Sequence, residues 1–183
     1  MPTGEVEFSD SKAIPIGEVS MGIYYTMENL MVSRLANSVS ALGIARKALL
    51  ETYYYSRKRV AFGRHLIEHP LYMRDLLDME VYLEGSMALA FKAVAMFQQS
   101  WKDVPPYGKD YHYARLLTHI SKNITSEMAA GVTKMAMELH GGLGFLSEFP
   151  IERLHRSGIS FRYWTPESHF RLCSTTPLSS RRN

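Results

Sequence analysis

The sequence predicts an all-α fold, an antiparallel up-down four-helix bundle, and three observations predict it. Apolar residues recur at steps of three, four or seven over three long segments, which is the spacing of one face of a helix. Proline and glycine separate these segments, so the connections between them are short. The 183 residues are 46% apolar and 21% charged, which is typical of a globular domain with one well-buried core. Long helices with short connections pack most simply in alternating directions.

The first helix is predicted from about Tyr24 to Arg57. The second is expected to begin after Pro70 and to end before Asp103, because two prolines and a glycine follow there. The apolar face of the first helix contains Leu35, Val39, Leu42, Leu49 and Tyr53, and that of the second contains Met73, Leu76, Leu83, Met87, Phe91, Val94 and Phe97.

The third helix is predicted to end at Gly141 and Gly142, because glycine readily adopts the left-handed backbone that ends a helix. A shorter fourth helix is expected from Pro150, since proline fits the first turn, and it continues through Arg156. The apolar face of the third helix is predicted to contain Tyr113, Leu117, Ile120, Ile124, Met128, Met135 and Leu139.

The two ends of the chain differ from this helical region. Residues 5–16 alternate apolar and polar, with Val6 and Phe8 on one side, and predict a short strand that has no partner strand nearby. Residues from 165 onward have no sustained period and are rich in Ser, Thr, Pro and Arg. The expected division is residues 1–20 as a strand-bearing remnant, 21–164 as the helical bundle and 165–183 as an irregular tail.

Composition also limits the class of protein. The formal net charge is +3, and the basic residues are mostly scattered along the chain, which argues against a nucleic-acid-binding arm. The one dense basic cluster consists of Arg57, Lys58, Arg59 and Arg64. The single cysteine, Cys173, excludes an intramolecular disulfide. No signal peptide and no apolar run of about 18 residues is visible, so we expect a cytoplasmic protein without a membrane span.

Motifs for metal or nucleophilic chemistry are absent from the sequence. It has no Cys-x-x-Cys, His-Glu-x-x-His, phosphate-binding loop or Gly-x-Ser-x-Gly pattern, so neither a metal site nor a complete catalytic site is predicted. We interpret His140 as a helix-end or interfacial histidine in preference to a metal ligand.

Two other stretches suit a dinucleotide. Arg59 is followed by Phe62 and Gly63 at a helix end, and three glycines lie within residues 141–144 at another helix end. A guanidinium can hold a phosphate with paired hydrogen bonds, an aromatic ring can stack on a base, and glycine admits a bulky ligand close to the backbone. Each feature alone also has a structural explanation, as a solvated helix end, a core ring or a helix cap.

In combination, these residues carry a family resemblance. The pattern Arg-x-x-Phe-Gly at 59–63, the run Gly-Gly-x-Gly-Phe at 141–145 and the segment 148–156 follow one another in an order that resembles the C-terminal helical domain of the acyl-CoA dehydrogenases. The stretch before the first helix looks like the last strand of that family's β domain. The resemblance covers about residues 5–164. The phrases PTGEVEFSD and LMVSRLANS look closest to the adaptive-response branch, whose members act in alkylation damage.

The resemblance implies a FAD site shared between subunits of a homo-oligomer, a dimer or tetramer. Arg59 takes the place of the family arginine that reaches the FAD pyrophosphate, and Phe62 that of the aromatic near the adenine. Arg34 matches an arginine near the acyl-CoA substrate. Glu138 stands where the family often has Gln. The positions that match FAD contacts are Arg59, Val60, Ala61, Phe62, His69, Glu138, Gly141 and Gly142.

The resemblance also implies a function with one departure. Thr165 aligns with the glutamate that serves many members as the catalytic base, and Glu167 follows two residues later, so no catalytic residue is assigned. The family's N-terminal helical domain and most of its β domain have no counterpart. We expect a C-terminal part of a FAD-dependent acyl-CoA dehydrogenase, inactive alone, whose intact enzyme performs α,β-dehydrogenation of an acyl-CoA thioester. A non-catalytic oligomeric helical module and a nucleic-acid-associated adaptive-response protein are the alternatives.

Overall fold

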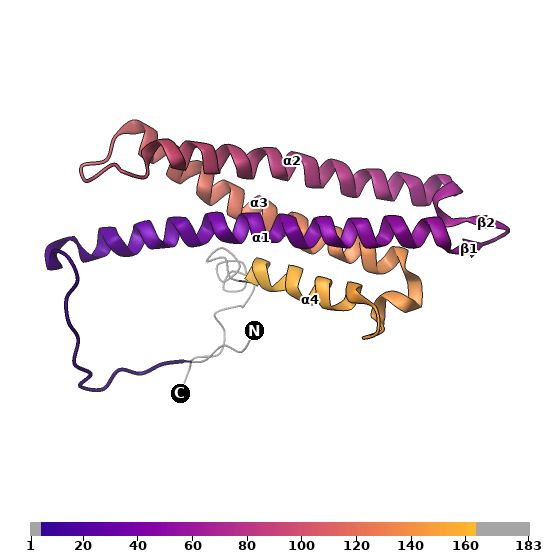
Figure 1. The fold of residues 1–183 in the computed structure, drawn as a ribbon, viewed down its shortest axis with the longest axis horizontal. Coiled ribbons are helices and arrows are strands. Elements are labelled where there is room, and N and C mark those ends of the chain that lie inside the picture. The colour runs from indigo at the N-terminus through magenta and orange to yellow at the C-terminus, as the bar shows by residue number, and fades with distance from the viewer. Residues whose placement is uncertain (1–4, 164–183) are drawn as a thin grey trace, which may run out of the picture.

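A computed structural model describes residues 5–163, and these residues form a bundle of four α-helices in an up-down order (Figure 1). The predicted all-α, antiparallel fold is confirmed. The elements are η1 (Val19–Met21), α1 (Gly22–Lys58), β1 (Val60–Ala61), β2 (Arg64–His65), η2 (Leu66–Glu68), α2 (Pro70–Ser100), α3 (Lys109–Leu139), η3 (Gly141–Phe145) and α4 (Pro150–Tyr163), where η denotes a short 3-10 helix.

The ends of these helices follow from the sequence. Proline opens both α2 and α4, where its missing N–H costs no hydrogen bond. The chain leaves α3 through Gly141, whose φ of +61° lies in the left-handed region that favours glycine. The predicted boundaries at Pro70, Gly141 and Pro150 are therefore correct.

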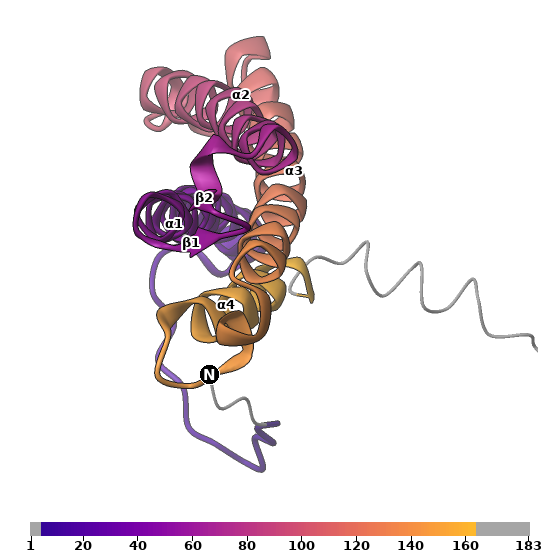
Figure 2. The same cartoon turned by 90° about the vertical axis from the view of Figure 1, so that its right-hand side faces the viewer.

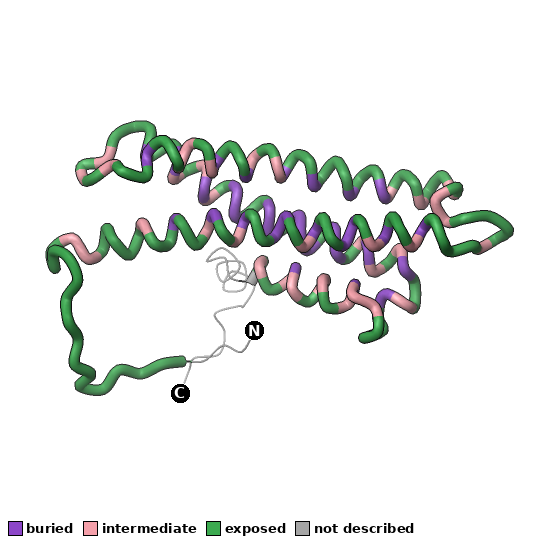
Figure 3. Tube along the Cα trace, viewed as in Figure 1, coloured by how far each residue is buried: buried purple, intermediate pink, exposed green. Residues whose placement is uncertain are grey.

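Helix α3 packs against each of the other three helices, α1, α2 and α4 (Figure 2). The buried residues concentrate where α1 and α3 face each other (Figure 3). Many of them are alanines, which let two helix backbones approach closely. The fully buried alanines of this core are Ala41, Ala45, Ala48, Ala90, Ala129 and Ala136.

The apolar face predicted for the third helix is wrong in part. Tyr113, Ile120 and Ile124 are exposed, whereas a row of small residues on the same helix is buried. Most hydroxyls of this row donate within the helix, as Thr118 does to the carbonyl of Ala114 at 2.8 Å, and among residues 5–163 that of Ser121 has no partner. Small side chains permit close contacts between helices. The buried face of α3 is therefore determined by side-chain size as well as by hydrophobicity.

The strand predicted in residues 5–16 does not form, because no second strand lies beside it to complete a hydrogen-bond ladder. Val6 and Phe8 are exposed there. Within the described residues the one sheet is an unpredicted hairpin of two short strands, β1 and β2, which pairs Val60 with His65. The tail predicted from residue 165 lies outside the described residues, and the division of the chain into three parts stays a prediction.

No helix among residues 5–163 combines the length and the apolar character needed to cross a membrane.

Candidate functional site at the Arg59 end of the bundle

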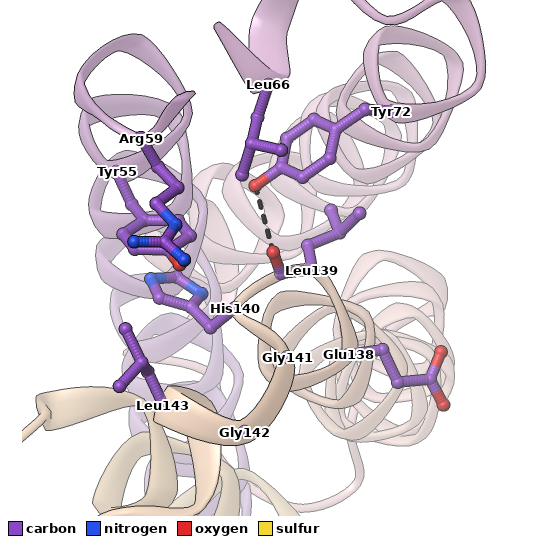
Figure 4. A pocket seen from close by; sticks show the side chains of 10 residues that line it. All are labelled: Tyr55, Arg59, Leu66, Tyr72, Glu138, Leu139, His140, Gly141, Gly142 and Leu143. Atoms are coloured by element: carbon purple, nitrogen blue, oxygen red, sulfur yellow. Dashed lines mark hydrogen bonds between the residues drawn. The ribbon is translucent and has the colours of Figure 1, made fainter. Parts of the chain in front are cut away.

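The C-terminal ends of α1 and α3 meet at one end of the bundle and enclose a hollow of about 480 Å³ (Figure 4). Helix α1 contributes its last turns, α2 its first turn, and the α3–η3 corner contributes the opposite wall. The hollow thus joins two segments about 80 residues apart in sequence. Its lining residues are Tyr55, Arg59, Leu66, Tyr72, Glu138, Leu139, His140, Gly141, Gly142 and Leu143.

Arg59 is the positive charge of this hollow. It caps α1, and its backbone N–H donates to the carbonyl of Tyr55 at 2.9 Å while its carbonyl accepts from the N–H of Leu66 at 3.0 Å. These two bonds fix where the side chain starts. Within residues 5–163 the guanidinium takes part in no ion pair. It is therefore held in place and available to an anion.

The glycines of the opposite wall divide into two kinds. A Cβ added at Gly141 or Gly142 would meet no atom within 4 Å, so the space above both residues is open. A Cβ added at Gly144 would lie 2.5 Å from the carbonyl oxygen of Met137, because η3 packs directly onto α3 there. Gly144 is structural, whereas Gly141 and Gly142 leave room for a ligand beside the backbone.

Two stacked rings form the floor of the hollow. The imidazole of His140 and the ring of Tyr55 lie nearly parallel, with centroids 4.4 Å apart. The Nδ1 atom of His140 donates to the carbonyl of Ala136 at 2.7 Å. Burial lowers the pKa of His140, and the bond to Ala136 and the charge of Glu51 oppose that shift. His140 is thus a neutral, well-anchored side chain near neutral pH.

Tyr72 ties α2 to the same corner. Its hydroxyl donates to the carbonyl of Leu139 at 3.2 Å, which satisfies one of the free carbonyls at the end of α3. Burial, followed by the proximity of Tyr55, raises the pKa of Tyr72 above its usual range. The hydroxyl therefore stays protonated and keeps donating.

The hairpin beside the hollow has an unusual backbone. Phe62 and Gly63 have φ values of +51° and +81°, as the two central residues of a tight hairpin turn require. Positive φ is uncommon for a bulky residue, and such conformations cluster at functional sites. The ring of Phe62 is 96% exposed at the hairpin tip. The imidazole of His69 holds the hairpin by donating from Nε2 to the carbonyl of Ala61 at 3.1 Å.

The structure brings together some of the residues predicted to contact FAD. Arg59, Glu138, Gly141 and Gly142 line the hollow. The other four form the adjoining hairpin and the turn that follows it, without lining the hollow: Val60, Ala61, Phe62 and His69.

The side chain of Glu138 is directed away from Arg59 and His140 (Figure 4). Its carboxylate lies 3.5 Å from the ammonium of Lys134, one turn earlier on α3. A carboxylate that faced a bound phosphate would repel it, and the direction of the Glu138 side chain avoids this repulsion.

Arg34, predicted to lie near the substrate, is remote from the hollow. It precedes Arg59 by 25 residues on the same helix, which is about 37 Å along the axis. Its guanidinium lies 3.3 Å from Nε2 of His119 on α3. Any site that includes Arg34 is separate from the hollow at Arg59.

The sequence prediction missed six residues that line the hollow: Tyr55, Leu66, Tyr72, Leu139, His140 and Leu143. Tyr55 could have been found, because it lies four residues before Arg59 and so on the same face of α1. Leu139, His140 and Leu143 also adjoin predicted positions in sequence, whereas only the packing of η2 and α2 at this end of the bundle brings Leu66 and Tyr72 to the hollow.

The residues that could carry other chemistry are few. A Glu-x-x-His spacing occurs at Glu152 and His155 on α4, but Glu152 pairs with Arg156 and His155 contacts the hydroxyl of Thr133. Residues 5–163 contain no group of three side chains that could hold a metal ion. Thr165 and Glu167, the positions compared with the family's base, lie outside the described residues.

The four-helix bundle, with a hollow between an arginine and two glycines at one end, defines a class of helical domain. Comparisons with known proteins identify the family of this domain. Residues 20–165 match the family described as acyl-CoA dehydrogenase, C-terminal domain. The chain belongs to this family.

Individual relatives agree with that assignment. The short-chain-specific acyl-CoA dehydrogenase of Megasphaera elsdenii is 32% identical over 155 residues, which are 82% of this chain and 37% of that protein. Cyclohexane-1-carbonyl-CoA dehydrogenase of Geobacter metallireducens is 28% identical over 141 residues, covering 77% of this chain and 34% of that protein. The structure of butyryl-CoA dehydrogenase from Megasphaera elsdenii superposes with a TM-score of 0.73 at 29% identity, covering 86% of this chain and 39% of that one.

Two conclusions follow from these similarities. The chain spans about a third of the length of the relatives it matches. The predicted closeness to the adaptive-response branch finds no support, since the relatives named above are dehydrogenases of short-chain and cyclic acyl-CoA compounds.

Proposed function

We propose that this chain is the C-terminal helical part of a FAD-dependent acyl-CoA dehydrogenase and that its hollow at Arg59 holds the diphosphate of FAD. The observation that carries the proposal is that one hollow brings together two open glycines and a guanidinium that has no ion pair within the described part of the chain. Membership of the family supports the choice of ligand.

The described residues fit such a group. A diphosphate carries negative charge, which the guanidinium of Arg59 would bind with paired hydrogen bonds. The backbone of Gly141 and Gly142 leaves open space for the ligand to approach. The exposed ring of Phe62 is available for stacking on the flat adenine, since it projects from the hairpin beside the hollow.

The proposed activity of the intact enzyme is α,β-dehydrogenation of an acyl-CoA thioester. FAD, when bound, supplies the acceptor for the hydride that leaves the β carbon. This chain's described residues would bind and orient the diphosphate end of the cofactor, and none of them is placed to remove the α proton. The chain alone is therefore proposed to be inactive.

The proposal is tested by retention of flavin on the purified chain. The chain is incubated with excess FAD and desalted, and its visible flavin absorbance is measured beside Arg59→Ala and Arg64→Ala. Loss of one charge-assisted contact of about 1.5–3 kcal/mol should weaken binding by about tenfold to a hundredfold in Arg59→Ala. Arg64→Ala serves as the matched control, because Arg64 lies in the same basic cluster but outside the hollow.

Retained flavin that disappears only in Arg59→Ala would support the proposal. Equal retention in all three proteins, or none in any of them, would contradict it.

A second candidate function, an oligomeric helical module without flavin, is favoured by the exposed apolar side chains of α2 and α3. Side chains of this size in water favour association with a like surface. Those exposed on these two helices include Leu77, Val81, Tyr82, Phe91, Leu116, Ile120 and Ile124. We propose that the chain forms a homo-oligomer in either case.

Light scattering on the desalted samples separates the two candidates. A stable oligomer that carries no flavin favours the module, and an oligomer that retains flavin favours the dehydrogenase domain. A monomer at all concentrations would contradict oligomerisation.

A further inference from the structure

His140 lies in the floor of the hollow with one ring nitrogen unused. A backbone carbonyl can only accept, so the bond to Ala136 requires the proton of the neutral imidazole to be on Nδ1. In that tautomer Nε2 has a bare lone pair. Among residues 5–163, the hydroxyl of Ser121 is the one side-chain polar atom that is both fully buried and without a hydrogen-bond partner. Nε2 of His140 is not such an atom, and it therefore keeps some exposure to solvent.

The surroundings of the ring direct Nε2 to the hollow. One face of the imidazole is covered by Tyr55, Nδ1 is held by α3, and His140 lines the hollow, so Nε2 is the ring nitrogen left to face a ligand there. Arg59 lines the same hollow from α1. A proton added to Nε2 would place a second positive charge beside the one that Arg59 supplies.

We propose that Nε2 of His140 is a second contact for the diphosphate in the hollow, switched on by protonation, so that FAD binds more tightly as the pH falls. This inference rests on the proposed function, since it assigns regulation to the same site. In the neutral state the lone pair of Nε2 faces a bound phosphate without attraction. In the protonated state the N–H donates to it with the strength of a charge-assisted hydrogen bond.

The other charged groups around His140 leave this switch in place. On α1 the carboxylate of Glu51 is already paired with Lys47, and on α3 Glu138 is paired with Lys134. On α2 the nearby group is Tyr72, whose hydroxyl stays protonated.

The direction of the pH effect follows from linkage. Because burial lowers the pKa of His140, the free protein keeps it neutral, and a bound anion favours the protonated form. Affinity for the anion therefore rises as the pH falls through the pKa of His140, and bound FAD raises that pKa by the same free energy. Stability without ligand changes in the opposite sense, since unfolded His140 binds its proton more readily.

The experiment compares FAD affinity by calorimetry at about pH 8 and about pH 5, because burial lowers the pKa of His140 in the free protein below the ordinary histidine value. Each phosphate of FAD has one ester bond, one anhydride bond and one ionised oxygen over this range, so the ligand's diphosphate does not titrate. The wild-type chain should bind about five- to tenfold more tightly at the lower pH, which corresponds to a pKa change of about one unit. His140→Gln should bind with nearly the same affinity at both pH values.

His112→Gln is the matched control. His112 is exposed on the same helix, 28 residues before His140 and about 42 Å away along the axis. It should keep the full pH dependence of the wild type. If His140→Gln also keeps it, or if the wild type shows none, the inference is overturned while FAD binding through Arg59 stands. Absence of FAD binding at both pH values would overturn the proposed function and the inference together.

Titration of the histidine ring protons by NMR provides a second test that needs no variant of His140. FAD should raise the pKa of His140 in the wild-type chain and leave that of His112 unchanged. His65 and His69 lie in the neighbouring hairpin and turn, and residue-specific signals separate their titration from that of His140. A pKa of His140 that FAD does not move would overturn the inference.

Discussion

The two ends of the bundle are built in contrasting ways. At the end where α2 turns into α3, Tyr107 stacks on Tyr111 with centroids 3.8 Å apart, and its hydroxyl donates to the carboxylate of Glu28 on α1. At the other end Arg59, whose guanidinium has no ion pair among residues 5–163, lines a hollow next to an exposed Phe62. We call the first end, with Tyr107 and Tyr111, the closed end, and the second, with Arg59, the open end. Trp101 is exposed at the closed end too, with Lys102 over its ring, but the open end places its cation and its exposed ring beside a hollow.

This difference separates residues that stabilise the bundle from residues that are proposed to bind a ligand. A charge and a large ring left in water add little to stability. Substitutions at the closed end should therefore change the free energy of unfolding, and substitutions in the hollow should change ligand binding. Gly144 and Gly142 provide the most local test of this contrast. Gly144 packs against α3, Gly142 lines the hollow, and both lie in the 3-10 helix η3.

The largest expected change in stability is that of Gly144→Ala. The added methyl would lie 2.5 Å from the carbonyl oxygen of Met137, and a backbone atom cannot move aside without shifting η3 from α3. We expect a loss of about 1–3 kcal/mol in the free energy of unfolding. Thermal unfolding should show a midpoint lower by about 2–4 °C for each kcal/mol.

Gly142→Ala is its matched control. The added methyl would meet no atom within 4 Å and should change stability by no more than about 0.5 kcal/mol. Equal destabilisation by the two substitutions would contradict the distinction between a packed and an open glycine.

A smaller effect is expected from Tyr107→Phe. The substitution removes the hydrogen bond to Glu28 and keeps the stack on Tyr111. It should lower the free energy of unfolding by about 0.5–1.5 kcal/mol and leave FAD binding unchanged. Chemical denaturation measures the first quantity and the flavin absorbance the second.

Tyr113→Phe, which changes an exposed tyrosine on α3 two residues after Tyr111, should leave both quantities unchanged. A loss of flavin in Tyr107→Phe would show that the two ends are not independent.

Much of the fold could be predicted from the sequence, because local signals determine it. Pro70 and Pro150 open helices, and Gly141 ends one, each through its own backbone restriction. The buried face of α3 could not be predicted from hydrophobicity, since close packing selected small residues and left Ile120 and Ile124 exposed. The β1–β2 hairpin was missed because its turn contains Phe62 where Asn or Gly is usual.

The candidate site was predictable in part. Arg59 and the glycines at 141 and 142 were identified from their residue types, and the structure places them in one hollow. His140 was interpreted as a helix-end or interfacial histidine, because the role proposed for it depends on a stack with Tyr55 that joins two helices distant in sequence. Such contacts are set by tertiary packing and leave no local pattern.

The measurement that tests the central claim most directly is an NMR titration of the backbone amides with FAD. The account predicts shifts at Arg59, Gly141 and Gly142 that saturate together, with no change at Tyr107 or Tyr111 at the closed end. Shifts centred on the closed end, or none at the hollow under saturating FAD, would contradict it.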